Sequence, residues 1–263
     1  MRIIVPVKQI QDPRGVTVRR DKEKIFVNQE DYVLEPGSKA AIEAALRLKD
    51  AGTEDAGHEV IALCVGKIQA DDALREALAL GCDSAYLLSD KAFEEADISV
   101  TVHILAAAIR KLGGADLVIA GREASDTGAG QTGPRLAEAL SMAQATDVYA
   151  VALEADDVQV VRRWEDGYRT VRVQLPAVVT VAPVAFPPRY AHGARIMNAY
   201  REWEVPVWAA DDLGLDDAAL RPLLSFRRQS FAPPLQVGEQ FQGDPACVAQ
   251  DVVAALRTQK IVK

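Results

Sequence analysis

The residues best suited to bind a ligand form a glycine-rich loop between Gly121 and Gly133. Glycines let backbone N–H groups approach a bound group closely, and hydroxyl side chains add further donors. The loop contains Gly121, Gly128, Gly130, Gly133, Ser125, Thr127 and Thr132. It follows an apolar run at 117–120 and leads to an amphipathic helix that we expect to begin after Pro134. Since a helix N-terminus carries partial positive charge and free N–H donors, the loop is suited to phosphate.

A polar surface turn that binds nothing is the competing interpretation of this loop. Its spacing matches neither the G-x-G-x-x-G pattern of dinucleotide sites nor the Walker pattern. The motif alone therefore leaves both interpretations open.

The elements that must position the loop alternate between short apolar strands and amphipathic helices. Strands are predicted at 2–7, 60–65, 85–88, 117–120 and 177–181, and helices at 71–80, 97–112 and after Ser38, a predicted N-cap. This alternation predicts an α/β fold with a doubly wound, mainly parallel sheet and right-handed crossovers. Ligands bind beyond the carboxyl ends of such strands, which makes Pro6 and Lys8 candidate pocket residues.

The pattern changes after residue 146. A β-hairpin is predicted from strands at 158–163 and 168–173, because Asp166-Gly167 accepts the positive φ of a tight turn. The strand at 177–181 is expected to close the sheet, and 16–27 to form a hairpin or meander. A short helix at 195–202, an edge strand within 203–208, an extended arm at 221–243 and a helix at 244–258 complete the chain. We expect an α/β domain at 1–208 and a C-terminal arm and helix at 209–263 that pack on a partner subunit or on the same domain.

The composition limits the classes of partner. The 263 residues include 38 acidic and 30 basic side chains, a formal charge of −8, which disfavours nucleic acid and anionic membranes. No apolar run approaches the roughly 20 residues that a membrane helix needs, so no membrane insertion is expected. Three scattered cysteines and no recognisable signal peptide favour a reducing cytoplasm.

The sequence offers no convincing catalytic centre. His58, His103 and His192 are far apart, and no G-x-S-x-G elbow is present. The spacing of cysteines and histidines gives no zinc or iron–sulfur ligand set. We therefore predict a protein that is not an enzyme by itself, with no catalytic residues and no metal site.

Several collinear segments resemble the β subunit of electron transfer flavoproteins over nearly the whole chain. The most specific is Gly-Arg-Glu-Ala-Ser-Asp at 121–126 with Gln-Thr-Gly at 131–133. The others are 5–12, 41–49, 59–66, 74–83, 176–181 and 188–191. The chain departs from the family's usual Asn-Pro at Glu35-Pro36, where an anionic Glu35 would suit a ribose hydroxyl better than a phosphate.

The resemblance implies a heterodimer with an α subunit that shares a redox-active FAD, while this chain holds AMP or, in electron-bifurcating members, a second FAD. By position, the implied cofactor-binding residues are Pro6, Glu35, Pro36, Gly37, Ser38, Val65, Gly121, Arg122, Glu123, Ala124, Ser125, Asp126, Thr127, Gly128, Ala129, Gly130, Gln131 and Thr132. The implied partner-recognition residues are Arg189, Tyr190, Ala191, His192, Gly193, Ala194, Arg195, Ile196 and Met197.

The function implied is electron transport. The subunit would accept electrons from flavin dehydrogenases such as the acyl-CoA dehydrogenases of fatty acid β-oxidation and pass them to an electron transfer flavoprotein–quinone oxidoreductase or another acceptor. Two alternatives rest on the same loop and sheet. One is a stand-alone adenine-nucleotide-binding regulatory protein of the stress-protein type. The other is a nucleotide-dependent hydrolase, for which no base is visible.

Overall fold

A computed structural model describes residues 1–22, 24–52, 57–154, 157–225, 231 and 238–262. Contacts divide the chain into two compact units. The first contains Met1–Val18 and Ile25–Arg227, and the second contains Arg19–Lys24 and Arg228–Lys263.

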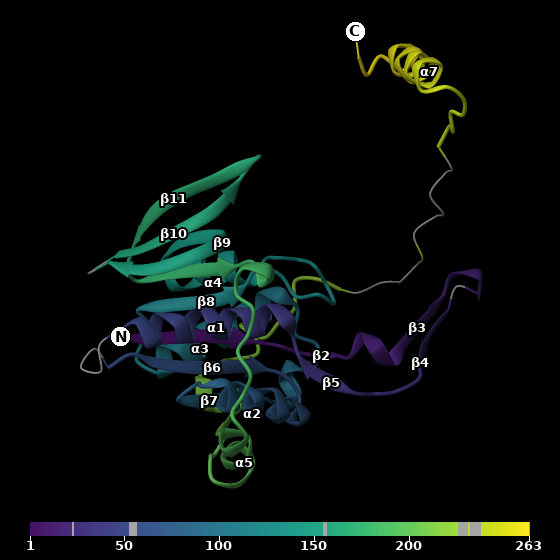
Figure 1. The fold of residues 1–263 in the computed structure, drawn as a ribbon. Helices are drawn as coiled ribbons and strands as arrows, with labels where there is room; N and C mark the ends of the chain where they lie inside the picture. Colours follow the sequence, from purple (N-terminus) through teal and green to yellow (C-terminus); the bar gives the residue numbers. More distant parts are fainter. Residues whose placement is uncertain (23, 53–56, 155–156, 226–230, 232–237, 263) are drawn as a thin grey trace. The chain divides into compact units, whose positions relative to one another are not determined.

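The first unit is built on a nine-stranded sheet with the order β11-β10-β9-β12-β8-β1-β6-β7-β13 (Figure 1). Its strands are β1 (Arg2–Val7), β6 (Glu59–Val65), β7 (Ser84–Leu88), β8 (Leu117–Gly121), β9 (Ala143–Glu154), β10 (Asp157–Trp164), β11 (Gly167–Gln174), β12 (Ala177–Val181) and β13 (Val207–Trp208). The pairs from β13 to β9 are parallel, and β9-β10-β11 is antiparallel.

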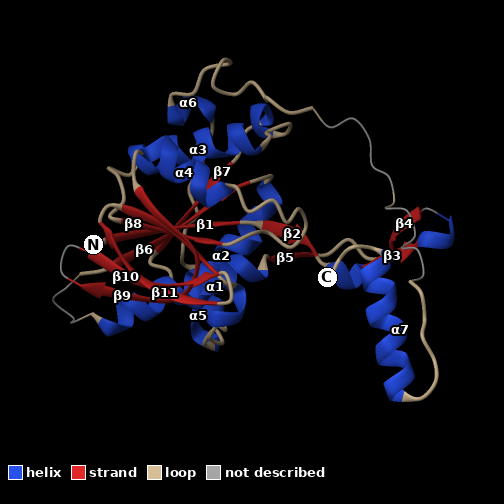
Figure 2. Cartoon of the chain, turned by 90° about the horizontal axis from the view of Figure 1, so that it is seen from above, coloured by secondary structure: helices blue, strands red, loops and turns tan. Residues whose placement is uncertain are grey.

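Helices cover both faces of this sheet. The helices are α1 (Pro36–Ala51), α2 (Asp71–Leu80), α3 (Ile98–Lys111), α4 (Thr132–Leu140), α5 (Gly193–Arg201) and α6 (Ala210–Leu213). Ile3 and Val5 of β1 lie in an apolar cluster with α1 and α2, whereas Ile4 lies in a second cluster with α3 and α4. Figure 2 shows α1, α2 and α5 on one side of the sheet and α3, α4 and α6 on the other. The predicted doubly wound α/β sheet is therefore confirmed.

The order of the strands reverses between β1 and β8. From β1 the chain adds β6 and β7 on one side, and it then crosses to β8 and β12 on the other side. The pairing of β1 with β8 covers only Ile3↔Leu117 and Ile4↔Val118, so it ends before the carboxyl ends of the strands. Such a switch point is where ligands bind in open α/β sheets.

The sequence analysis misplaced one strand of the sheet and missed another. Strand β12 lies between β9 and β8, in the interior of the sheet, so it does not close the sheet. Strand β9 was not predicted at all. Many of its residues are partly or fully exposed, and Ala143, Gln144 and Thr146 give its first half no apolar run. The edge at this end of the sheet is β11.

The predicted hairpin is confirmed as β10 and β11, but its turn differs from the prediction. Trp164 pairs with Gly167, so Glu165 and Asp166 form the turn and Gly167 belongs to the strand. The positive φ of +49° falls on Glu165. Helix α4 also begins at Thr132, whereas it was predicted to begin after Pro134, which is now its third residue. Proline is tolerated in a first helical turn because those N–H groups have no acceptor within the helix.

Two small sheets lie apart from the main one. Strands β2 (Gln9–Gln11) and β5 (Tyr32–Leu34) pair with each other, as do β3 (Val16–Arg19) and β4 (Lys24–Val27) of the predicted hairpin. The second unit contains α7 (Pro245–Thr258), where a helix was predicted, with Asp244 as its N-cap. Residues 226–230 and 232–237 of the predicted arm lie outside the described residues. No described helix is both long and apolar enough to span a bilayer.

Candidate functional site

The predicted cofactor residues come together at the switch point. Lys8 follows β1, the glycine-rich loop follows β8, and Glu35 precedes α1. An ion pair links the first two segments, because Lys8 Nζ lies 2.6 Å from Asp126 Oδ2. Both side chains are partly exposed, so the ammonium group of Lys8 is accessible from solvent beyond the carboxyl end of β1.

Glu35 joins the start of α1 to the loop. One carboxylate oxygen accepts a hydrogen bond of 2.7 Å from the backbone N–H of Ser38, and the other accepts one of 3.2 Å from the N–H of Ser125. Glu35 is therefore the N-cap of α1, and the predicted N-cap role of Ser38 was wrong. The Ser38 hydroxyl instead accepts a hydrogen bond from the N–H of Lys8, at 3.0 Å. With 3% of its surface exposed, Glu35 has little freedom to reach a ribose hydroxyl.

The loop's glycines serve two different purposes. A Cβ at Gly121 would lie 2.8 Å from the carbonyl carbon of Gly37, and one at Gly133 would lie 2.2 Å from Cγ2 of Thr180. These two glycines allow elements to pack closely. Gly128 and Gly130 have φ values of +60° and +61°; a Cβ would meet nothing within 4 Å at Gly128 and would make an ordinary contact of 3.5 Å with the carbonyl oxygen of Arg122 at Gly130. They give the loop a left-handed backbone that other residues adopt only at a cost.

The N-terminus of α4 has unused hydrogen-bond donors. Gln131 is the N-cap, but its side chain makes no capping hydrogen bond, and its backbone is already helical. Among the described residues, no side chain caps this end. The loop at 125–131 is exposed. Pro134 has no N–H and the N–H of Arg135 bonds to the carbonyl oxygen of Gln131, so the donors left at this helix end are those of the half-buried Thr132 and the buried Gly133. These donors and the ammonium of Lys8 suit an anion such as phosphate.

Arg122 is bound by carboxylates of its own chain. Its guanidinium lies 2.5 Å from Oε1 of Glu123 and 3.3 Å from Oδ1 of Asp147. The hydrogen bond to Glu123 is the main reason that the pKa of Arg122 is raised, and Asp147 adds to it. Sequence reasoning missed Asp147, which follows the start of the unpredicted strand β9.

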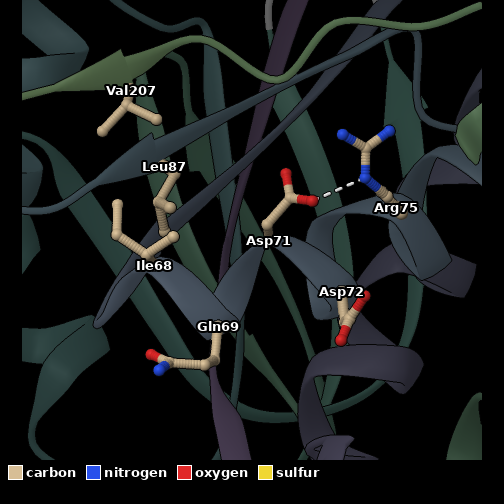
Figure 3. Close-up of a pocket in the computed structure, with 7 residues that line it drawn as sticks. All are labelled: Ile68, Gln69, Asp71, Asp72, Arg75, Leu87 and Val207. Atoms are coloured by element: carbon tan, nitrogen blue, oxygen red, sulfur yellow. Dashed lines mark hydrogen bonds and ion pairs between the residues drawn. The ribbon is translucent and has the colours of Figure 1, made fainter.

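A separate cavity of about 310 Å³ lies near the start of α2 (Figure 3). It is lined by Ile68, Gln69, Asp71, Asp72, Arg75, Leu87 and Val207. Arg75 Nε lies 2.5 Å from Asp71 Oδ2, and Asp72 adds a second negative charge. None of the predicted cofactor residues lines this cavity, and its acidic side chains do not suit phosphate.

Val65, another predicted cofactor residue, is the last residue of β6 and is half-buried. Strand β6 is the neighbour of β1 in the sheet.

The predicted recognition segment at 189–197 is anchored by its arginines. Arg189 Nε lies 2.8 Å from Glu43 Oε2, and its Nη2 lies 2.8 Å from Asp50 Oδ2. Arg195 Nη2 donates to the carbonyl oxygen of Leu78 at 2.7 Å, near the end of α2. Tyr190 between them is fully exposed. Within this segment, the two arginines therefore anchor the backbone, whereas the aromatic side chain of Tyr190 is left at the surface.

Glu43 is an additional residue that sequence reasoning missed. It is 6% exposed, although it belongs to α1, and it binds both Arg189 and Arg47. Burial alone raises the pKa of Glu43, but the hydrogen bonds from Arg189 and Arg47 outweigh this effect and hold the pKa below its usual value. The sequence signal for this buried carboxylate was a single acidic residue on the apolar side of the helix, between Ile42 and Ala44. Helix α5 itself begins at Gly193, two residues before its predicted start, with His192 as N-cap.

The chain matches the family model described as the electron transfer flavoprotein domain over residues 24–213. This match covers most of the chain and includes the glycine-rich loop. The chain belongs to the electron transfer flavoprotein family.

Relatives in this family match the chain along most of its length. It is 38% identical to the caffeyl-CoA reductase–Etf complex subunit CarD of Acetobacterium woodii, covering 100% of both chains. It is 39% identical to the electron transfer flavoprotein subunit beta of Clostridium acetobutylicum, covering 84% of this chain and 83% of the relative. Protein FixA of Azorhizobium caulinodans is 34% identical, with 89% and 85% covered. The resemblance on which the site residues were predicted is therefore confirmed at the level of the family.

Proposed function

We propose that the chain is the β-type subunit of a heterodimeric electron transfer flavoprotein. In this role it positions cofactors and forms an electron-transfer complex with an α-type subunit, without acting as an enzyme by itself. The observation that carries the proposal is the anion-suited crevice at the switch point of a chain whose relatives are named as electron-transfer subunits.

The crevice would hold a nucleotide, either AMP or a second FAD, next to a first FAD shared with the α subunit. The fit rests on the ammonium of Lys8, the uncapped start of α4 and the left-handed backbone at Gly128 and Gly130. These groups suit the phosphate of either nucleotide. FAD, when bound, supplies the redox chemistry, and this chain's residues bind and orient it.

Each predicted cofactor segment has its own part in this proposal. The loop at 121–132 supplies backbone donors, and Pro6, Val65 and the segment at 35–38 form its surroundings. Glu35 fixes the distance between α1 and the loop through its two hydrogen bonds. Asp126 holds the ammonium group of Lys8 in place at the crevice.

The segment at 189–197 would contact electron donors. Its exposed side chains Tyr190, Ile196 and Met197 are apolar or aromatic, while Arg189 and Arg195 fix the backbone that carries them. Donors of the acyl-CoA dehydrogenase type would place this chain in fatty acid β-oxidation. A quinone oxidoreductase or another acceptor would then receive the electrons, and electron bifurcation is the variant in which this subunit holds a second FAD.

The C-terminal part of the chain would pack on the α subunit. Helix α7, which the structure describes throughout, has no buried residue. Its apolar side, including Val248, Val252 and Leu256, would then be covered by the partner. This assignment concerns α7; within the proposed C-terminal part at 209–263, α6 packs on the second apolar cluster of the first unit, which extends to Arg227. The complex would work in the cytoplasm.

The test is the nucleotide content of the complex with its α-type partner. The purified heterodimer is treated with acid, and the released FAD, AMP and ATP are quantified by chromatography. One FAD with one AMP fits a single-flavin carrier, and two FADs fit a bifurcating one. Absence of both a complex and a flavin contradicts the proposal, and stable ATP binding by the isolated chain favours the nucleotide-sensor alternative.

A further inference from the structure

Two arginines face each other at the end of the β10–β11 hairpin. Arg162 of β10 and Arg169 of β11 are direct partners in the register of these strands. Cross-strand partners share one face of the sheet, and like charges placed directly opposite each other are destabilising. This hairpin forms one end of the main sheet (Figure 1), so the pair is accessible from outside the core.

The pair continues an apolar face of the hairpin that is buried at Val158, Val160 and Val173 and exposed at Val171. Along the same face, Val158 pairs with Val173, and Val160 pairs with Val171. Val158, Val160 and Val173 belong to the first apolar cluster. The two arginines therefore follow these valines on the same face, towards the turn of the hairpin.

Neither arginine has a carboxylate partner in the part of the chain that the structure describes. Arg162 donates one hydrogen bond from Nη2 to the hydroxyl of Thr146, at 3.0 Å, and its Nε is buried with no partner among the described residues. By contrast, Arg172 on the same hairpin lies 2.7 Å from Oε2 of Glu154. A guanidinium normally binds carboxylates with two parallel hydrogen bonds, so the Arg162–Arg169 pair has unused capacity for an anion.

Trp164 holds both arginines in place. The guanidinium carbon of Arg169 lies 4.4 Å from the centre of the Trp164 ring, and that of Arg162 lies 5.5 Å from it. The Trp164 side chain is itself partly exposed, at 39%. Tryptophan and arginine are the residue types most enriched at the centres of protein interfaces.

We propose that Arg162, Trp164 and Arg169 form a docking site for a carboxylate-bearing surface of the α-type partner subunit. The inference rests on the proposed function, because it names a contact within that complex. Charge complementarity supports an acidic partner: among the described residues, neither of these adjacent guanidiniums forms an ion pair with a carboxylate, whereas Arg172 does. A protein fits better than a nucleic acid, because the chain as a whole carries a charge of −8.

The test compares three variants of the full chain in binding to the purified α-type subunit. Arg169→Glu reverses one charge of the pair, and Arg169→Gln removes it. Arg163→Glu is the matched control, since Arg163 is exposed on the next position of β10 and therefore points to the opposite face. The dissociation constant is measured by sedimentation at low and high salt.

We expect Arg169→Glu to weaken binding about tenfold or more at low salt, and Arg169→Gln to weaken it less. Both variants should also depend less on salt than the wild type, because one charge contact is lost. Arg163→Glu should bind within about twofold of the wild type. Arg169→Gln removes a like-charge pair but also the contact of Arg169 with the Trp164 ring, so the isolated variant should unfold close to the wild-type temperature.

Wild-type affinity in Arg169→Glu, or an equal loss in Arg163→Glu, overturns the inference. In these cases a complex with its normal flavin content leaves the proposed function intact. If the wild-type chain binds no α-type subunit, both the inference and the proposed function fail.

Discussion

The glycine-rich loop and the segment at 189–197 use their polar groups in opposite ways. In the loop, the start of α4 has no side-chain cap, and residues 125–131 are exposed. In the segment, Arg189 and Arg195 are bound to α1 and α2, and it is Tyr190 that faces solvent. The loop thus leaves backbone donors unused, as we propose for an anion site, whereas the 189–197 segment uses its arginines to anchor its backbone and exposes Tyr190.

The largest expected effect concerns the base of the loop. Gly121→Ala places a Cβ 2.8 Å from the carbonyl carbon of Gly37, so the backbone must shift. We expect a loss of about 3 kcal/mol in the free energy of unfolding, measured with urea. Gly128→Ala is the control, since nothing lies within 4 Å of its Cβ and only the φ of +60° is unfavourable. Its cost should be about 1 kcal/mol. Equal costs would show that close packing of α1 on β8 is not the reason for Gly121.

Glu43 of α1 anchors the 189–197 segment through Arg189. Glu43→Gln removes the buried charge that binds Arg189 and Arg47, so we expect a loss of about 2 kcal/mol, less than for a fully buried pair because both arginines are partly exposed. The control is Glu76→Gln, which breaks the more exposed pair with Lys39 and should cost below about 1 kcal/mol. A smaller loss for Glu43→Gln than for the control contradicts the anchoring role.

The same anchor predicts a pH dependence. The pKa of Glu43 is lower in the folded protein than its usual value of 4.5. Such a carboxylate stabilises the fold fully above the unfolded-state pKa, and its contribution is lost as the pH falls through the folded-state pKa. The difference in unfolding free energy between wild type and Glu43→Gln should therefore be constant well above pH 4.5 and shrink below it. A difference that grows on acidification would contradict this account.

The smallest effect on stability is expected at the exposed tip of the segment. Tyr190 is fully exposed, so Tyr190→Ala should change the free energy of unfolding by less than about 0.5 kcal/mol. If the segment contacts electron donors, the same variant should slow flavin reduction by a donor dehydrogenase while the nucleotide content stays normal. Unchanged reduction kinetics would remove Tyr190 from the proposed docking surface.

The parts of the fold that sequence predicted well are buried on both faces. Strands β1, β6, β8 and β12 are nearly continuous apolar runs. Helix α2 also has the predicted bounds. Strand β9 was missed because its alternation is weak, and β12 was misplaced because strand order depends on contacts far apart in the sequence.

The position of the candidate site was predicted better than its chemistry. The alternation of strands and helices predicts that the loop follows the carboxyl end of a parallel strand, and it follows β8; that β8 lies at the switch point depends on the strand order, which the alternation does not give. The separate roles of Gly121 and Gly130 depend on neighbours brought close by folding, which the spacing of glycines does not encode. Glu35 takes the N-cap role expected for Ser38, because its longer side chain reaches the N–H groups of both Ser38 and Ser125.

The central claim is that the loop after β8 holds a nucleotide, and Gly130→Val tests it most directly. Gly130 and Gly214 have nearly equal φ values, +61° and +64°, so Gly214→Val is a control for backbone strain far from the loop in sequence. Each variant is purified with the α-type subunit, and released FAD and AMP are quantified per heterodimer. We predict that Gly130→Val loses the nucleotide of this subunit while Gly214→Val keeps it. Normal nucleotide content in Gly130→Val would contradict the account.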